Sequence, residues 1–334
     1  MAEGGDALTH GMLLGKFLPP TQGHAYLVDF ARASCDKLTV LVCTLPDEPI
    51  PGDLRAAWMR EMFPRCEIVH HDAVVPQTPD DHPRFWDIWR RLIRASVPAP
   101  IHRVFASEPY GERLAAELGA EIVPVDLYRR AVPVSARAIR ADPMAHWRFI
   151  PPVVRPYYLR RVRVVGPEST GKSTLAAELA AHFGTCVAEE YARPLLEPKG
   201  GRCDLDDIPR IARGQRASEE ALARQANRVL FCDTDLTTTV IWSELLFGGC
   251  PEWIRAEADQ HSYDLTLLLD VDVPWVDDNQ RHFPERRREL FDRFKAIFSA
   301  QPGELVVLSG DFDARRAQAV AAVEALMRRP VRVG

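Results

Sequence analysis

The sequence lacks the features that place a protein in a membrane or outside the cell. No stretch of its 334 residues approaches the roughly 20 consecutive apolar residues that a transmembrane helix needs. The first ten residues are polar and acidic, without the basic and apolar regions of a secretory signal. The seven cysteines are scattered and contain no CxxC pair, which favours free thiols over disulfides or a zinc site. We therefore expect a cytoplasmic protein without membrane contact.

A global basic charge is also missing. The chain has 42 Lys and Arg against 47 Asp and Glu, for a formal net charge of −5. This balance argues against sequence-independent binding to nucleic acid. The hydrophobic content of 46% and the charged content of 27% are typical of globular domains, and the length is sufficient for two of them.

Apolar runs alternate with helical patterns along the first part of the chain. Strands are predicted at residues 11–17, 38–45, 66–71, 102–107 and 120–126, with amphipathic segments between them. This alternation is typical of a doubly wound parallel sheet, which binds its ligands beyond the carboxyl ends of the strands.

Prolines and aromatic residues interrupt this alternation at 141–161, and a second α/β series follows. We place the boundary near residue 158. The fold class predicted is α/β, with two doubly wound parallel-sheet domains at 1–158 and 159–334.

The strongest motif lies at the start of the second domain. Residues 166–173, GPESTGKS, match GxxxxGK[ST] between a predicted strand and a predicted helix, which is the context of a P-loop. Backbone N–H groups of such a loop wrap the β-phosphate, Lys172 bridges the β- and γ-phosphates, and the Ser173 hydroxyl ligates Mg²⁺. The candidate ATP-binding residues are Gly166, Glu168, Ser169, Thr170, Gly171, Ser173 and Thr174.

An acidic pair follows a later strand, in VLFCDTD at 229–235. Asp233 or Asp235 would hold Mg²⁺ or activate an attacking hydroxyl, as a Walker-B-like carboxylate does. The alternative is that these acids cap the helix that follows.

Two further charged segments follow strands of the second domain. EEYAR at 189–193 stands where small-molecule kinases often hold their acceptor, although a plain surface run is the alternative. Arg281 and the run 286–288 would form a lid over the transferred phosphoryl group, or else simply a solvated face.

The stretch GKFLPPTQGH at 15–24 is a weaker signal on the first predicted strand. Gly15 permits close approach of a ligand, and His24 at the start of a helix would donate to a bound phosphate. A capped turn with a packed histidine explains the same residues equally well. Ser135 and Arg140, in VPVSARAIR, are similarly either phosphate ligands or a helix cap.

Taken together, these motifs resemble the NadR-type bifunctional enzymes, in which a nicotinamide-nucleotide adenylyltransferase is joined to a ribosylnicotinamide kinase. GKFLPPTQGH is similar to the family signature GKFxPxHxGH, PVSARAIR to ISGTxIR, and FASEPYGERLA to SSExYG. The resemblance continues, in order along the chain, through DHPRFWDIW, FIPPVVRPYY, GPESTGKST, EEYAR, DTDLTTT and VPWVDDNQR.

The resemblance implies a Rossmann-like nucleotidyltransferase followed by a P-loop kinase, both using ATP and Mg²⁺. In the kinase, nicotinamide riboside would become NMN. Lys172 and Ser173 would serve Mg·ATP, Ser173 and Asp235 the metal, and Arg281 the phosphoryl group. The riboside would lie among Glu190, Tyr191, Arg193 and Trp242, with an aromatic ring stacked on the cationic nicotinamide.

In the nucleotidyltransferase, the resemblance implies that the NMN phosphate attacks the α-phosphate of ATP and yields NAD. Catalysis then consists of positioning and charge stabilisation by Lys16, His24, Ser135 and Arg140. The further binding candidates are Gly15, Phe17, Thr21, Gly23 and Trp86.

Three positions depart from the family pattern. Thr21 stands for the first histidine of HxGH, Ala136-Arg137 for the Gly-Thr of ISGTxIR, and Asn279 for a glycine of the lid. The first two leave an alternative open, a kinase whose first domain only binds nucleotide and regulates. A third hypothesis, a non-enzymatic P-loop scaffold or regulator, is also open.

Some relatives carry a DNA-binding helix-turn-helix before the first strand. Here that strand is predicted to begin near Gly11, so we expect no such domain and no DNA binding. The expected partners are the small molecules nicotinamide riboside, NMN, ATP and NAD, and a homo-oligomer is possible.

Overall fold

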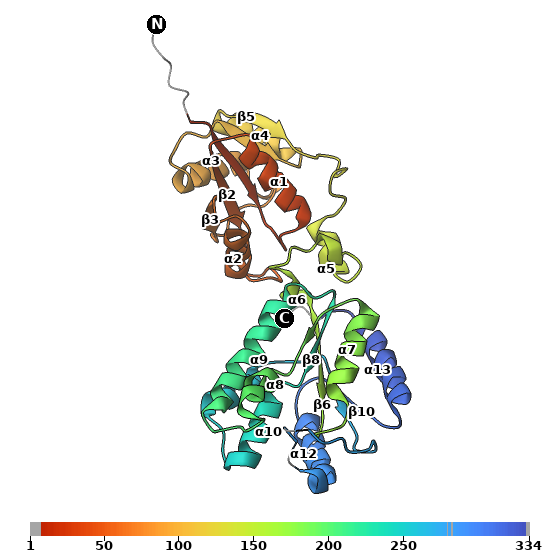
Figure 1. Ribbon diagram of the computed structural model, residues 1–334. Coiled ribbons are helices and arrows are strands. Elements are labelled where there is room, and N and C mark those ends of the chain that lie inside the picture. The colour runs from red at the N-terminus through yellow and green to blue at the C-terminus, as the bar shows by residue number, and fades with distance from the viewer. Residues whose placement is uncertain (1–7, 279, 282, 332–334) are drawn as a thin grey trace. The chain divides into compact units, whose positions relative to one another are not determined.

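The computed structural model describes residues 8–278, 280–281 and 283–331. The chain forms two compact units, which separate between Val154 and Arg155. Each is a parallel sheet covered by helices on both faces (Figure 1). Asn279, at which the sequence departs from the family pattern, lies outside the described residues.

The first unit alternates strands and helices as predicted. Its elements are β1 (His10–Gly15), α1 (Gln22–Ala33), β2 (Lys37–Cys43), α2 (Gly52–Met62), β3 (Glu67–His71), η1 (Pro79–Asp81), α3 (Phe85–Ser96), β4 (Arg103–Ala106), α4 (Tyr110–Leu118), β5 (Glu121–Pro124), α5 (Ala136–Ala141) and η2 (Trp147–Phe149).

The sheet of the first unit has the order β3-β2-β1-β4-β5, and all its pairings are parallel. The chain builds outward from β1 in one direction and then returns to add β4 on the other side. In such a sheet the crevice for ligands opens at this switch point, beyond the carboxyl end of β1. Helices α1 and α2 share one hydrophobic cluster with the sheet, and α3 and α4 share another.

The second unit repeats this architecture. Its elements are α6 (Arg155–Tyr158), β6 (Arg160–Val165), α7 (Lys172–Phe183), β7 (Val187–Ala188), α8 (Ala192–Leu196), η3 (Glu197–Lys199), α9 (Asp207–Ala223), β8 (Val229–Asp233), α10 (Leu236–Phe247), α11 (Glu252–Gln260), β9 (Leu265–Leu269), η4 (Pro284–Arg286), α12 (Arg287–Ser299), β10 (Glu304–Leu308) and α13 (Phe312–Met327).

Its sheet has the order β10-β9-β6-β8-β7, again entirely parallel. Strand β6 is central, and α7 and α13 pack against one hydrophobic cluster of the unit. The carboxyl ends of β6, β8 and β9 therefore meet at one edge, where the P-loop, the acidic pair and the arginine-rich loop all begin.

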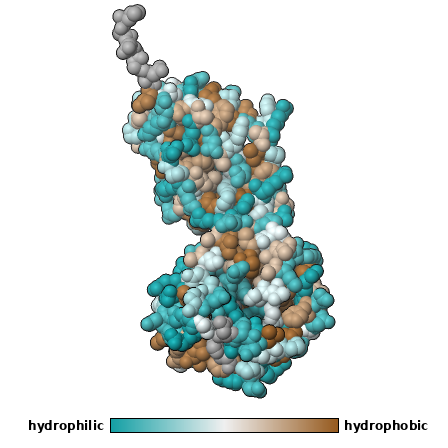
Figure 2. Space-filling model, viewed as in Figure 1, coloured by the Kyte–Doolittle hydropathy of each residue, from teal (hydrophilic) through white to brown (hydrophobic). Residues whose placement is uncertain are grey.

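All seven cysteines are free thiols. Within the described residues, no helix combines the length and the apolar character that crossing a bilayer requires. On the face seen in Figure 2, hydrophilic side chains are interspersed with hydrophobic ones over both units, as on the water-exposed surface of globular domains.

Candidate functional sites

The loop between β6 and α7 is shaped by bonds within itself. The Thr170 hydroxyl donates to the Pro167 carbonyl at 2.9 Å, and Lys172 Nζ donates to the same carbonyl at 3.0 Å. Gly166 and Gly171 have φ angles of 145° and 88°, which strain any residue with a side chain. The loop thereby curls at the N-terminus of α7, where free N–H groups favour a bound phosphate.

A buried arginine that the sequence analysis did not select supports this loop. Arg315 of α13 is 1% exposed and donates to the carbonyl oxygens of Thr170 at 2.8 Å and Asp270 at 3.0 Å. It also pairs with Asp272. These bonds tie the P-loop to the end of β9, and no local sequence pattern marks them because Thr170 is 145 positions away.

The two acids at the end of β8 have different surroundings. One oxygen of Asp235 accepts from the Thr238 backbone N–H at 2.8 Å and caps α10. The other oxygen pairs with the buried Arg163 at 2.7 Å. Because both oxygens are engaged within the fold, the structure gives Asp235 the role of a helix cap rather than of a metal ligand or a base.

Asp233 is buried beside Lys172, Ser173, Glu190 and Arg193. Its Oδ1 has no hydrogen-bond partner in the described part of the chain, and the Ser173 side chain lies beside its carboxyl group. Burial, followed by the charge of Glu190, raises the pKa of Asp233 to about 6. A carboxylate with a free oxygen next to a hydroxyl is a donor set that suits Mg²⁺.

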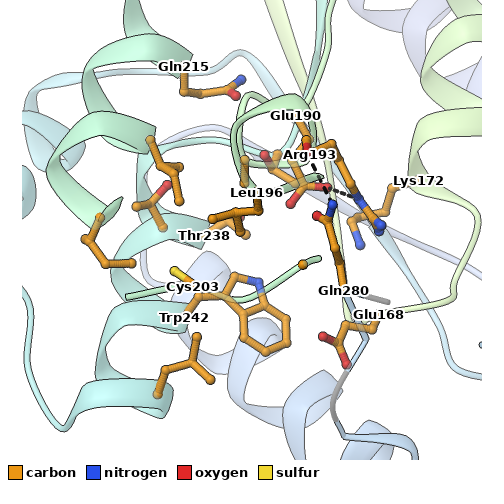
Figure 3. A pocket seen from close by; sticks show the side chains of 17 residues that line it. Glu168, Lys172, Glu190, Arg193, Leu196, Cys203, Gln215, Thr238, Trp242 and Gln280 are labelled. Atoms are coloured by element: carbon orange, nitrogen blue, oxygen red, sulfur yellow. Dashed lines mark hydrogen bonds and ion pairs between the residues drawn. The ribbon is translucent and has the colours of Figure 1, made fainter. Parts of the chain in front are cut away.

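A cavity of about 100 Å³ opens beside these residues. Its charged and polar wall consists of Glu168, Lys172, Glu190, Arg193, Gln215, Thr234, Thr238, Thr239 and Gln280. Figure 3 shows Glu190, Arg193 and Gln280 turned toward one another, with Lys172 beside them. The P-loop lysine and the EEYAR segment follow different strands, β6 and β7, and both face the same cavity.

Trp242 supplies an aromatic wall of this cavity, and its ring stacks on Phe283 at a centroid distance of 6.2 Å and an angle of 17°. Tyr191, the other aromatic candidate, does not line the cavity. Its ring lies against Gly214 of α9, where an added β-carbon would stand 2.1 Å from Tyr191 Cε1. Of the two aromatic candidates, only Trp242 is therefore placed to face a ligand in this cavity.

The arginines predicted to form a lid divide into two pairs. Arg281 Nη1 lies 3.4 Å from the Ser169 hydroxyl, and Arg287 Nη2 donates to the Ser169 carbonyl at 3.2 Å. Arg286 and Arg288 instead form ion pairs with Glu289 and Asp270. The first two bring positive charge to the P-loop, and burial together with the charge of Arg281 lowers the pKa of Arg287.

In the first unit, Thr21 and His24 form a reciprocal cap at the start of α1. The backbone N–H of Thr21 donates to His24 Nδ1 at 3.0 Å, and the Thr21 hydroxyl accepts from the backbone N–H of His24 at 3.2 Å. Since Nδ1 accepts, the proton of the neutral ring is on Nε2. Burial, and then the charge of Arg129, lowers the pKa of His24 to about 4. His24 is thus a neutral imidazole that donates through Nε2.

Lys16 is held by a buried pair that the sequence analysis did not select. Its Nζ lies 2.9 Å from Glu48, and Glu48 in turn pairs at 2.6 Å with Arg55, which is 0% exposed. Arg55 also donates to the Lys16 carbonyl at 2.8 Å. Both the backbone and the side chain of Lys16 are thus fixed by residues of and before α2.

The PVSARAIR segment folds onto the same loop. Ser135 caps α5 by accepting from the Ala138 backbone N–H at 3.1 Å, and Arg140 donates to the Leu18 carbonyl. Arg137 lines the neighbouring cavity. The segments 15–24 and 135–140 therefore lie together although more than a hundred residues separate them.

These residues surround a cavity of about 770 Å³. All the predicted residues of the first domain line it, namely Gly15, Lys16, Phe17, Thr21, Gly23, His24, Trp86, Ser135 and Arg140. It is also lined by Glu108, Tyr110, Asp126 and Arg129, which were not predicted. Asp126 accepts the backbone N–H groups of the three residues 130–132, and this shapes the loop that carries Arg129.

Within the described residues, no group of three or more His, Cys, Asp or Glu side chains is arranged to hold a metal ion. The Asp233–Ser173 pair remains the best donor set, because Mg²⁺ usually needs only one or two protein ligands and takes the rest from phosphate and water.

Comparison with known proteins connects both units to one family. Residues 161–315 match the AAA domain family. The chain is 29% identical over 343 residues to the trifunctional NAD biosynthesis/regulator protein NadR of Escherichia coli strain K12, and 28% identical over 341 residues to the protein of the same name from Salmonella typhimurium. These alignments cover 96% and 95% of this chain and 83% of each relative. The chain is thus similar to NadR proteins along almost its whole length.

Solved structures show the same fold. A crystal structure of NadR protein in complex with NR has a TM-score of 0.75 and covers 97% of both chains at 23% identity. A second, in complex with NAD and AMP-PNP, has a TM-score of 0.74 and covers 98% of both chains at 23% identity. The predicted class, α/β with two doubly wound parallel sheets, is thereby confirmed for this chain.

Proposed function

We propose that the chain carries out two consecutive transfers from ATP. In the second unit, nicotinamide riboside would receive the γ-phosphoryl group and become NMN. In the first unit, NMN would receive an AMP group from a second ATP and become NAD, with release of pyrophosphate. The observation that carries this proposal is the presence in one chain of a P-loop facing an acceptor cavity and of a larger cavity lined by cations, in a protein related to NadR along almost its whole length.

In the kinase step, the 5′-hydroxyl oxygen of the riboside attacks the γ-phosphorus and the bond to the β,γ-bridging oxygen breaks. Mg²⁺ brought with ATP would be held by Ser173 and Asp233 and would neutralise charge on the β- and γ-phosphates. Lys172 and Arg281 stand on the phosphate side and complement the same charge.

We assign the proton of the attacking hydroxyl to Glu190. This carboxylate lines the acceptor cavity, whereas Asp233 is buried beside Ser173 and does not line it. Arg193, 3.3 Å from Glu190, orients it, and Trp242 offers an aromatic surface for a cationic nicotinamide ring.

In the adenylylation step, a phosphate oxygen of NMN attacks the α-phosphorus of ATP in line and pyrophosphate leaves. No enzyme nucleophile is required, so the residues position the reactants and stabilise charge. His24 donates through Nε2, while Lys16 and Arg140 are cations already fixed on the loop.

Two assays with the purified protein test the proposal. Nicotinamide riboside with Mg·ATP should yield NMN, and NMN with Mg·ATP should yield NAD and pyrophosphate. Lys172→Ala should remove the first product alone and His24→Ala the second alone. If neither product forms, a non-enzymatic role replaces this proposal.

A second candidate function rests on the altered PVSARAIR segment. Arg137, at the position where the family has Thr, lines the large cavity. If this cation binds the triphosphate without supporting transfer, the first unit is a nucleotide-binding regulatory module. In that case no NAD forms above the His24→Ala control, while ATP or NAD still binds.

A further inference from the structure

One carboxylate in the second unit bridges two arginines. Asp278 lies in the loop after β9, and its Oδ2 is 2.9 Å from Arg193 Nη1 and 2.9 Å from Arg281 Nε. Its Oδ1 accepts the backbone N–H of Gln280 at 2.8 Å, which fixes the orientation of the carboxylate. A single negative charge is therefore shared by two cations that arrive from different segments.

The two arginines belong to opposite halves of the site. Arg193 pairs with Glu190, and both line the acceptor cavity. Arg281 donates to the Val276 carbonyl and lies 3.4 Å from the Ser169 hydroxyl of the P-loop. Asp278 thus stands between the acceptor side and the phosphate side.

A second bond joins the same two segments. Gln280 Nε2 donates to the Arg193 carbonyl at 3.2 Å, as the dashed line in Figure 3 shows. On its other side the acceptor segment is held by α9, where the Gln215 side chain accepts the Tyr191 backbone N–H at 3.0 Å. Gln215 is 1% exposed, so this attachment to α9 lies in the interior of the unit.

We propose that Asp278 is a positioning residue that couples the binding of nicotinamide riboside to the binding of ATP, an inference that rests on the proposed kinase function. A triphosphate in the P-loop competes with Asp278 for Arg281, because opposite charges attract strongly in a partly buried site. Asp278 is then left to Arg193 alone and holds it, with Glu190, in one orientation. The riboside then binds more tightly, because its site is already ordered. By linkage, bound riboside increases the affinity for ATP by the same factor as bound ATP increases the affinity for riboside.

Calorimetric titration of riboside tests this coupling. The riboside is titrated into the whole protein alone and into the protein saturated with Mg²⁺ and a non-hydrolysable ATP analogue. For the native sequence we expect riboside to bind about tenfold more tightly in the presence of the analogue. For Asp278→Asn the ratio of the two dissociation constants should fall to about 1, although each ligand still binds. A change of stability alone would not move this ratio.

Glu289→Gln is the matched control, because it also removes a carboxylate paired with an arginine but lies outside both halves of the site. It should keep the native ratio. If Asp278→Asn proves unfolded, Asp278→Glu carries the test, since it keeps the charge but displaces it by one methylene, and its ratio should be lower than native.

Two results overturn the inference while leaving the proposed function standing. In one, the native protein phosphorylates riboside but shows no coupling. In the other, the folded Asp278→Asn variant, or Asp278→Glu in its place, keeps the native ratio. If riboside is neither bound nor phosphorylated, the proposed kinase function fails and the inference fails with it.

Discussion

Residues 15–24 and residues 166–173 both lead from the central strand of a sheet into a helix, but they keep their shapes by different means. The P-loop combines two glycines at positive φ and side chains that bond to Pro167 with one distant support, since Arg315 donates to its Thr170 carbonyl from 145 residues away. The loop of the first unit depends on distant side chains, since Arg55 and Arg140 donate to its carbonyls from 39 and 122 residues away. We therefore expect both loops to be sensitive to substitution of these distant arginines, and the P-loop to be sensitive to substitution of its own glycines as well.

The largest effect is expected from Lys172→Ala. Under the proposed mechanism Lys172 bridges the β- and γ-phosphates, so its removal should lower kcat of riboside phosphorylation by about 10³-fold. NAD formation from NMN should stay at the native rate, because the first unit has its own cations. The rates are measured separately, with Arg286→Ala as a control that removes an exposed arginine. A loss of both activities would mean that the units do not act independently.

His24→Ala should lower NAD formation by about 10²-fold, because one preorganised donor to the α-phosphate is lost. The kinase rate should be unchanged. His146→Ala is the matched control, since that ring donates to the Asp142 carbonyl and does not line the cavity. If His24→Ala forms NAD at the native rate, the loop is a capped turn without a catalytic role.

A glycine pair compares the two loops directly. In Gly171→Ala the new β-carbon would stand 2.8 Å from Phe312 at a φ of 88°, so we expect a loss of about 1–3 kcal/mol in unfolding free energy and a weaker affinity for ATP. In Gly23→Ala the nearest atom is 3.4 Å away, so the thermal midpoint should be almost native. Thermal unfolding of both variants measures this difference. Equal destabilisation of the two would contradict the distinction between the P-loop, which needs a glycine at positive φ, and the first loop, which does not.

The two activities should also differ at acid pH. Burial and Glu190 raise the pKa of Asp233 to about 6 in the free enzyme, and only its ionised form serves the kinase, so kcat/KM for phosphorylation should fall about tenfold per pH unit below about 6. Burial lowers the pKa of His24 to about 4, so its ring stays neutral and adenylylation should show no loss from His24 above that pH. Initial rates of each step between pH 5 and 8 give the two profiles. If both rates fall in the same way below pH 6, Asp233 is not the group that limits the kinase alone.

The smallest effect is expected from Glu48→Gln. The variant removes the ion-pair partner of Lys16 without touching the cavity wall, so NAD formation should fall only severalfold, mainly through KM for ATP. Because Glu48 also pairs with the buried Arg55, the unfolding free energy should fall as well. The exposed Glu304, paired with Arg329 in the second unit, provides the control Glu304→Gln. An unchanged KM for ATP would show that Lys16 does not need this support.

Much of the fold was readable from the sequence because alternating strands and helices leave a local periodic pattern. The P-loop was also readable, because its glycines, lysine and serine stand at fixed spacing within one short segment between a strand and a helix. The first loop was readable only by its resemblance to a family, because Thr21 and His24 explain a simple helix cap equally well. Phe283 and Arg129 were missed, since nothing in their immediate neighbours distinguishes them from ordinary surface residues. Asp278 was not selected although it lies in the segment VPWVDDNQR, because that segment does not record which arginines its carboxylate meets.

The sequence by itself determined the class of fold, the position of the phosphate loop and the segments that supply the charged side chains. Only the tertiary structure decided between chemically identical neighbours. Asp235 is taken up by Arg163, which lies 72 residues before it, while Asp233 keeps an oxygen free beside Ser173. Likewise Arg281 and Arg287 reach the P-loop, but Arg286 and Arg288 pair at the surface. The physical reason is that a carboxylate or a guanidinium acts on the partner that the fold brings within hydrogen-bonding distance, and sequence spacing does not record that distance.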